Sequence, residues 1–101
     1  MAFNTMTDAV LIYHDKVLLP DNAIVEMRIW RLPIRNVERP HGLKYSLFYG
    51  ENGKRIIGYD NERGKGDHRH YFDEEEAIQF VDIEALVNSF LYDVRKHRSK
   101  L

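Results

Sequence analysis

The sequence predicts an α+β fold, an antiparallel sheet of four to five strands packed on one face by one C-terminal helix. Short apolar segments, several of them alternating with polar residues and divided by turn residues, occupy residues 8–59, which is typical of antiparallel strands. Apolar residues at helical spacing occupy residues 83–95. A chain of 101 residues suits one domain with one modest core. We therefore expect residues 1–101 to form a single domain, with residues 1–7 as a frayed terminus.

The first two strands are expected to form a hairpin. The apolar, β-branched run over residues 8–19 predicts a long first strand, although residues 9–13 show no clear period and also allow a helix. Pro20, Asp21 and Asn22 supply turn chemistry. The next segment alternates apolar Val25, Met27 and Ile29 with polar Glu26 and Arg28, which indicates a strand with one buried face.

A basic loop separates this hairpin from the next. Residues 31–42 contain two prolines and three arginines, so regular structure is not expected there. A third strand follows, in which Tyr45, Leu47 and Tyr49 alternate with other residues and are expected to face the core. Asn52-Gly53 is a strong hairpin signal and leads into a fourth strand over residues 54–59.

The segment between the fourth strand and the helix is less regular. A fifth short strand is expected over residues 70–72, or over residues 77–81 after the acidic run Asp73–Glu76. We interpret that acidic run as a solvated turn, with binding of a partner as the alternative.

The C-terminal helix carries the clearest pattern in the chain. Its apolar residues lie at i, i+3, i+4, i+7, i+8 and i+11: Ile83, Leu86, Val87, Phe90, Leu91 and Val94. Asp82 is a suitable N-cap, and Glu84 suits the positive end of the helix dipole. The basic residues from Arg95 to His97 suit the opposite end. This pattern predicts that Phe90 and Leu91 are buried against the sheet.

Composition excludes several classes of protein. The chain has no cysteine, so a disulfide framework, a zinc–thiolate site and a cysteine nucleophile are excluded. No apolar run approaches the roughly 18 residues of a membrane span, and the N-terminus lacks the pattern of a signal peptide. We expect a cytoplasmic protein without membrane contact.

The net charge of −1 conceals a segregation of charge. Basic residues outnumber acidic ones between Arg28 and Lys44 and again after Asp93, whereas acidic residues dominate from Asp73 to Glu84. Such a chain is suited to contact a polyanion with one side and a basic partner with the other. A well-mixed solvated surface explains the same pattern, and the sequence does not decide between them.

The stretch Tyr59–Tyr71 has the composition of a functional loop. It holds two His, two Arg, one Lys and three acidic residues, and almost nothing that fills a core. Gly64 and Gly66 permit sharp bends of the backbone. If the end of the stretch is extended, His68 and His70 share one face of a strand, with Asp67 and Arg69 on the other.

This stretch resembles the signature of the TumE family, small bacterial toxins of toxin–antitoxin pairs. Three further segments agree, namely Val25–Trp30, Gly42–Gly50 and the helix Ile83–Arg95, so the resemblance covers residues 9–97. The family usually has Asp-Gly at the first hairpin turn, where this chain has Asp21-Asn22-Ala23. The resemblance implies a cognate antitoxin, a DNA-binding regulator, as partner, and it favours RNA as the target.

The residue types at this stretch fit metal-independent cleavage of RNA. Histidine titrates near neutral pH and serves as a base for the 2′-hydroxyl or as an acid for the leaving 5′-oxygen, and cations stabilise the charge of the phosphorane. The expected catalytic residues are His68, His70, Lys65, Arg69, Asp67 and Asp60. The expected RNA-binding residues are Arg63, Arg28, Arg31 and Lys44. Lys65, Arg69 and His68 or His70 are predicted to converge on one concave spot, where Asp60 and Asp67 orient them.

Other interpretations of these residues remain open. His68 and His70 with Asp60 or Asp67 are suitable metal ligands, but the sequence places no further ligand, so neither a metal nor a cofactor is expected. The stretch is also compatible with a structural loop, and the whole chain with a non-catalytic module that binds protein or nucleic acid. Trp30 is interpreted as a core or sheet-edge residue, with base stacking as the alternative. No role is assigned to the three other histidines, His14, His41 and His97.

Overall fold

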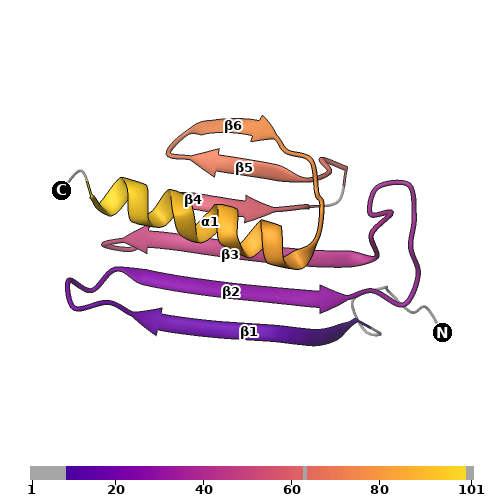
Figure 1. Ribbon diagram of the computed structural model, residues 1–101, viewed down its shortest axis with the longest axis horizontal. Helices are drawn as coiled ribbons and strands as arrows, with labels where there is room; N and C mark the ends of the chain where they lie inside the picture. Colours follow the sequence, from indigo (N-terminus) through magenta and orange to yellow (C-terminus); the bar gives the residue numbers. More distant parts are fainter. Residues whose placement is uncertain (1–8, 63, 100–101) are drawn as a thin grey trace.

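The sheet is a meander of six antiparallel strands in which each strand pairs with the next along the chain (Figure 1). A computed structural model describes residues 9–62 and 64–99. The strands are β1 (Val10–Leu18), β2 (Ile24–Arg31), β3 (Leu43–Glu51), β4 (Lys54–Asp60), β5 (His68–Tyr71) and β6 (Glu74–Ala77), followed by the helix α1 (Ile83–Arg98). The predicted antiparallel sheet under a C-terminal helix is confirmed, with six strands in place of four to five.

Both predicted hairpin turns are present. Asn22 and the pair Asn52-Gly53 have positive φ angles of 67°, 53° and 76°, the conformation that asparagine and glycine tolerate best. The helical alternative for residues 9–13 is wrong, because β1 begins at Val10. The expected basic loop is also confirmed over residues 32–42, while Arg31 is the last residue of β2.

The acidic run is where the sequence prediction fails. Glu74–Glu76 do not form a turn but lie in β6, and residues 78–81, expected as a possible strand, are irregular. All four residues of β6 are exposed, and its outer edge faces no other strand within the described part of the chain. Charged side chains suit such an edge because they discourage pairing with other chains. The turn itself is made by Phe72 and Asp73, between β5 and β6.

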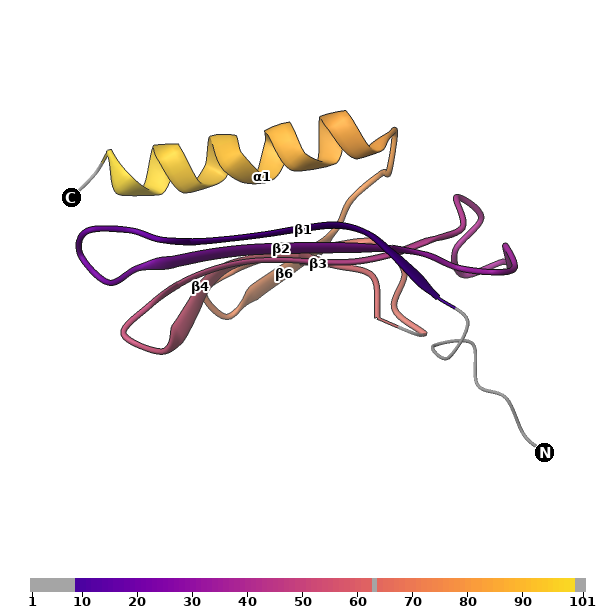
Figure 2. The same cartoon turned by 90° about the horizontal axis from the view of Figure 1, so that it is seen from below.

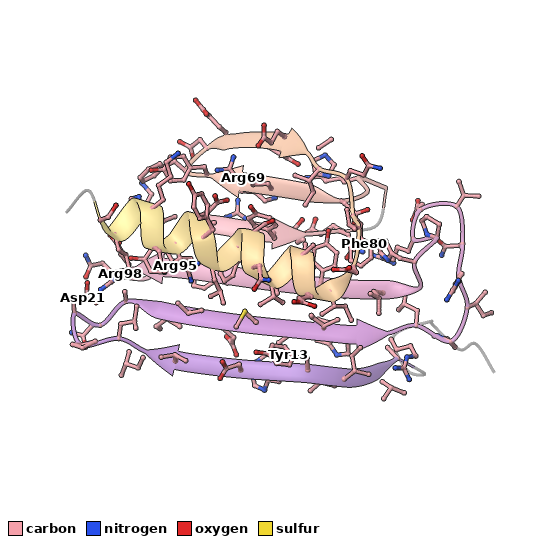
Figure 3. All side chains as sticks on the ribbon, in the orientation of Figure 1. Tyr13, Asp21, Arg69, Phe80, Arg95 and Arg98 are labelled. Atoms are coloured by element: carbon pink, nitrogen blue, oxygen red, sulfur yellow. The ribbon has the colours of Figure 1, made fainter. Side chains whose placement is uncertain are left out.

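Helix α1 begins as predicted. The side chain of Asp82 caps it, because its Oδ1 accepts a hydrogen bond of 2.7 Å from the backbone N–H of Ala85. The helix continues to Arg98, beyond the predicted end at residue 95. Figure 3 shows Arg98 and Asp21 at the same end of the molecule, where Nη2 of Arg98 lies 3.1 Å from Oδ2 of Asp21. Nη1 of Arg98 also donates to the Tyr49 hydroxyl. These contacts hold the last turn of the helix over the sheet.

The core lies between α1 and one face of the sheet (Figure 2). Phe90 is fully buried and Leu91 is partly buried, as the helical pattern predicts. Tyr45, Leu47 and Tyr49 of β3 are also buried, which confirms their expected orientation. Burial of this apolar surface is the main stabilising term of the fold.

The other face of the sheet carries no helix or strand among the residues that the structure describes, as Figure 2 shows. We call it the open face. The strand register places one row of residues across it, in the order His14, Arg28, Ser46, Asp60, His68 and Ala77. Five of these six residues are polar, which is consistent with contact with water or a polar ligand.

The expected frayed terminus, residues 1–7, lies outside the described residues, and so does Arg63. Within the described ranges, no helix has the length and apolar character needed to cross a membrane.

Candidate functional site

The signature stretch forms the end of β4, a loop and the whole of β5. In the pairing of β4 with β5, His68 lies opposite Asp60, and His70 lies opposite Gly58. Arg69 lies opposite Tyr59, whose side chain is directed to the helix and donates a hydrogen bond to Asp93. The predicted alternation is therefore confirmed, with both histidines on the open face and Arg69 on the helix-covered face.

A polar pocket of about 260 Å³ lies on the open face along β4 and β5. Its lining residues come from both strands, from the signature loop, from the β5–β6 turn and from β6: Arg55, Asp60, Glu62, Lys65, His70, Phe72, Asp73 and Glu75. Three of the six expected catalytic residues, namely Asp60, Lys65 and His70, thus meet in one pocket. We call it the open-face pocket.

His70 and Asp60 form the best-defined pair in this pocket. Nε2 of His70 lies 3.2 Å from Oδ2 of Asp60, and the His70 side chain is 10% exposed while that of Asp60 is 19% exposed. A carboxylate at this distance stabilises the protonated form of the imidazole.

His68 borders the pocket without lining it. Its Nδ1 lies 3.0 Å from the carbonyl oxygen of Gly66, and its Nε2 lies 3.7 Å from Oε1 of Glu75. Glu75 belongs to β6 and lines the pocket. His68 is therefore held at the rim of the pocket, and it lies opposite Asp60 in the pairing of β4 with β5.

Arg55 is a pocket residue that the sequence reasoning missed. A bulge in the pairing of β3 with β4, between Tyr49 and Gly50, shifts the alternation at the start of β4. The Arg55 side chain then lies over Gly58, where an added Cβ would be 2.9 Å from Arg55 Cδ. A glycine inside a strand often marks such a close approach, so Gly58 is the sequence signal for this arrangement.

Arg69 does not reach the open-face pocket. Its Nε donates to Oδ2 of Asp93 at 2.7 Å, and its Nη1 donates to Oε1 of Glu76 at 2.8 Å. Asp93 also accepts a hydrogen bond of 2.5 Å from the Tyr59 hydroxyl. Burial, together with this carboxylate, raises the pKa of Tyr59 above its ordinary value. Arg69 thus ties β5 to the helix.

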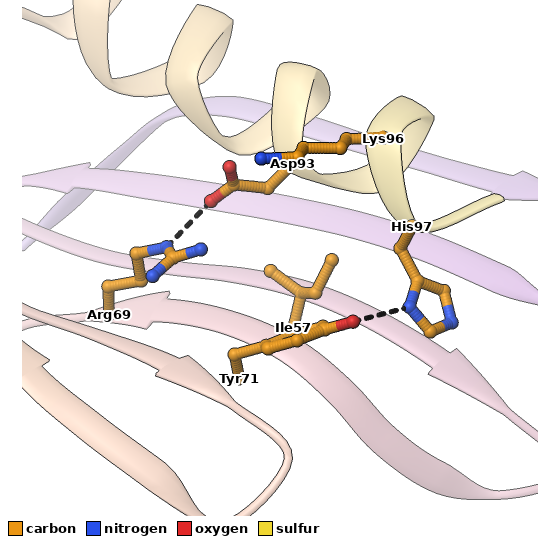
Figure 4. A pocket seen from close by; sticks show the side chains of 6 residues that line it. All are labelled: Ile57, Arg69, Tyr71, Asp93, Lys96 and His97. Carbon is orange, nitrogen blue, oxygen red and sulfur yellow. Dashed lines mark hydrogen bonds and ion pairs between the residues drawn. The ribbon is translucent and has the colours of Figure 1, made fainter. Parts of the chain in front are cut away.

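Arg69 also lines a second, smaller pocket of about 90 Å³ under the end of the helix (Figure 4). The other lining residues are Ile57, Tyr71, Asp93, Lys96 and His97. The Tyr71 hydroxyl and Nδ1 of His97 lie 3.0 Å apart, as the dashed line in Figure 4 shows. His97, to which the sequence assigned no role, therefore connects the helix to β5.

Asp67 is held by two residues of the helix-covered side. Its Oδ1 accepts a hydrogen bond of 2.6 Å from the Tyr45 hydroxyl and lies 3.1 Å from Nε2 of His41. The backbone N–H of Leu43 donates to Nδ1 of His41, so the proton of the neutral ring is on Nε2 and is directed to Asp67. Asp67 therefore anchors the signature loop to β3, and it does not line the open-face pocket.

Asn61 fixes the point where β4 ends and the loop begins. Its buried side chain accepts a hydrogen bond from the backbone N–H of Tyr45 and donates one to the carbonyl of Leu43. Its own carbonyl accepts two hydrogen bonds from the guanidinium of Arg39, which is also buried. Neither Arg39 nor Asn61 was predicted as a functional residue, and together they hold Asp60 in position.

The expected RNA-binding residues are spread over the sheet. Arg28 is on the open face and its Nη2 lies 2.9 Å from Oε2 of Glu26. Nζ of Lys44 lies 5.5 Å from the centre of the Trp30 ring. Arg31 is exposed at the end of β2. Strand alternation places it on the same side of the sheet as Met27 and Ile29, which is the helix-covered face. The fourth, Arg63, lies outside the described residues.

The predicted convergence is thus met in part. Lys65, His70 and Asp60 converge, whereas Asp67 and Arg69 lie on the helix-covered side. Within residues 9–62 and 64–99, no group of three or more histidine, cysteine, aspartate or glutamate residues is arranged to hold a metal ion.

Comparison with known proteins identifies the family. The family model described as Toxin TumE matches residues 5–98, nearly the whole chain. No curated protein and no solved structure matches the chain significantly. The signature stretch that forms the open-face pocket lies inside the matched region. The chain therefore belongs to the TumE family of toxins.

Proposed function

We propose that this TumE-family toxin acts on RNA and cleaves it, without a metal cofactor, at the open-face pocket. The observation that carries the proposal is the meeting of His70, Asp60 and Lys65 in one pocket from three separate positions of the signature stretch. An imidazole paired with a carboxylate, beside the cation of a lysine, is a combination suited to proton transfer at a phosphate.

In the proposed reaction, the 2′-oxygen of a ribose attacks the adjacent phosphorus and the bond from phosphorus to the 5′-oxygen breaks. The imidazole of His70 accepts the proton of the 2′-hydroxyl, and Asp60 stabilises the imidazolium that forms. Protonated His68, at the rim, donates a proton to the leaving 5′-oxygen. Lys65 and Arg55 stabilise the charge that develops on the phosphoryl oxygens.

The carboxylates of the pocket limit how tightly it binds the RNA backbone. Asp60, Glu62, Asp73 and Glu75 line the same pocket as Arg55 and Lys65, so formal negative charges outnumber positive ones there. We therefore assign backbone binding to the basic part of the open face outside the pocket, where Arg28 and Lys44 lie.

A toxin family implies a cognate antitoxin, and we propose β1 as its contact. β1 is the first strand of the sheet, so its outer edge is unpaired among the described residues. Half of the large hydrophobic side chains that the described surface exposes are on this one strand: Val10, Leu11, Tyr13, Val17 and Leu18. An exposed apolar edge strand is suited to pairing with a strand of a partner protein. The partner is expected to be a DNA-binding regulator.

Expression in a bacterial host tests the proposed activity. The wild-type protein should stop growth, and the double variant His68→Ala, His70→Ala should restore it at equal protein level. The matched control is His14→Ala, because His14 is a 40% exposed histidine outside the pocket. This control should remain toxic.

Incubation of the purified protein with total RNA, with and without EDTA, tests the chemistry. Cleavage that EDTA leaves unchanged is the expected result, and cleavage abolished by EDTA would contradict metal independence. A wild-type protein that is harmless and leaves RNA intact would favour the alternative, a non-catalytic module that binds a protein or nucleic acid.

A further inference from the structure

We propose that Trp30 and Lys44 form a base-stacking subsite on the open face, which makes single-stranded RNA the substrate class. The inference rests on the proposed action on RNA and adds to it a second point of contact, away from the reacting phosphate. Trp30 is the only tryptophan of the chain, so binding of a base at this subsite is directly measurable from tryptophan fluorescence.

The strand register places Trp30 on the open face. Its neighbour Ile29 is fully buried on the helix-covered face, and side chains alternate along a strand. Trp30 pairs with Lys44 of β3, and both side chains are partly exposed. Nζ of Lys44 lies 5.5 Å from the centre of the indole ring, a cation–π contact.

This arrangement suits a nucleotide better than it suits a core. The indole supplies a flat surface for a base, and the ammonium beside it supplies a partner for the phosphate of the same nucleotide. A base that stacks on the indole would bring its own phosphate close to the ammonium, which lies 5.5 Å from the ring centre. Base stacking on Trp30 and phosphate contact with Lys44 are thus available at one place on the open face.

The subsite and the pocket lie on one continuous path. Lys44 and Ser46 are two residues apart on β3, and Ser46 pairs with Asp60 of the pocket. Two strand spacings across the sheet and two residues along it separate Trp30 from Asp60 by about 12 Å. A short extended oligonucleotide spans this distance.

The charge along this path favours a polyanion. Lys44 lies at the start of the path, and Arg28, which is ion-paired with Glu26 at 2.9 Å, lies beside Ser46 in its middle. Glu26 is the one carboxylate among the described open-face residues of β1, β2 and β3 up to Gly50. The backbone of a bound strand would therefore meet Lys44 and Arg28 between the subsite and the pocket.

The subsite selects single strands because the indole of Trp30, on the surface of the sheet, can stack only on a base that is free to leave its neighbours. Bases within an A-form helix stack on one another, and the wide minor groove exposes their edges but not their faces. The open face therefore offers its contacts to an unpaired segment of RNA.

Intrinsic fluorescence tests the subsite without any substitution. The probe is a single-stranded RNA of about ten nucleotides with 2′-O-methyl groups, which binds but has no 2′-hydroxyl to react. Saturable quenching of the tryptophan signal is expected, and the same sequence as a duplex should quench less. Binding of the single strand, followed by an end label, without any change in tryptophan fluorescence would overturn the proposal. So would equal quenching by the duplex.

Two substitutions separate stacking from charge. Trp30→Ala should weaken binding of the probe about tenfold with an unchanged salt dependence, because it removes a stacking surface. Lys44→Ala should also weaken binding. It should lower the slope of the logarithm of the binding constant against the logarithm of the salt concentration by about one. Trp30→Phe should retain most of the affinity, which keeps the test valid if the alanine variant does not fold.

The control is Tyr92→Ala, because Tyr92 is 57% exposed on the helix and far from the open face. It should bind the probe as the wild type does. If Trp30→Ala also binds as the wild type does while total RNA is still cleaved, the subsite is wrong and the proposed function stands. If the wild type neither binds the probe nor cleaves RNA, both are wrong.

Discussion

Nε of Arg69 donates a hydrogen bond of 2.7 Å to Oδ2 of Asp93, so the middle of the signature strand is fastened to the helix. The same carboxylate accepts the hydroxyl of Tyr59. Asp93→Ala should lower the free energy of unfolding by about 2 kcal/mol, because it leaves a charged donor and a hydroxyl without their acceptor. Urea unfolding measures this change. The exposed Asp73→Ala serves as the control and should cost little. Equal values for the two variants would contradict the assignment.

Lys65→Ala should reduce cleavage of RNA while it leaves folding intact. Lys65 is exposed and lines the open-face pocket, so its removal takes away a phosphate contact without disturbing the core. The measurement is the rate of RNA cleavage, with thermal unfolding run in parallel. Lys54→Ala, at the exposed start of β4 outside the pocket, is the matched control and should cleave at the wild-type rate.

Phe90→Ala should destabilise the protein by about 3–5 kcal/mol, because its fully buried ring is replaced by a cavity between helix and sheet. Chemical denaturation measures the loss. Tyr92→Ala, two residues along the same helix and 57% exposed, should change the free energy of unfolding by less than about 0.5 kcal/mol. A small effect of Phe90→Ala would mean that the helix does not pack on the sheet as described.

Two tyrosines should make the fold sensitive to high pH. Burial raises the pKa of Tyr45 above its ordinary value of about 10, and its hydrogen bond to Asp67 adds to the shift. The pKa of Tyr59 is raised in the same way beside Asp93. Above about pH 10 these phenols lose their protons in the unfolded chain and keep them in the folded one, so the free energy of unfolding falls as pH rises.

Ultraviolet absorbance of tyrosinate measures this effect. In the folded protein, some tyrosines should fail to ionise until alkaline unfolding releases them in one cooperative step. Tyr45→Phe should reduce that step and flatten the loss of stability above pH 10. A smooth titration of every tyrosine near pH 10 would argue against the buried phenols.

The sequence predicts the parts of this fold that depend on local periods. The apolar stripe of α1, the Asp82 cap and the turn at Asn52-Gly53 all follow from residues near one another in the chain. The shared face of His68 and His70 follows from strand alternation alone. These features need no knowledge of distant contacts, because backbone geometry determines them.

The remaining features depend on partners far apart in the sequence. Asp67 meets His41, and Arg69 meets Asp93, over separations of 26 and 24 residues. No local pattern shows that these two residues of the signature are occupied by structural contacts. The bulge that brings Arg55 to the pocket, and the pairing that turns the acidic run into β6, likewise arise from register between strands.

Strand β5 has only four residues, and their side chains point alternately to the open face and to the helix-covered face. Insertion or deletion of a single residue within it would exchange His68 and His70 with Arg69 and Tyr71, and would place the imidazoles under the helix and the guanidinium in the solvent. The loop over residues 61–67 carries no such restriction on its length beyond its anchors at Asn61 and Asp67. Natural variation in length among relatives should therefore concentrate between these two anchors, while the four-residue strand keeps a constant length.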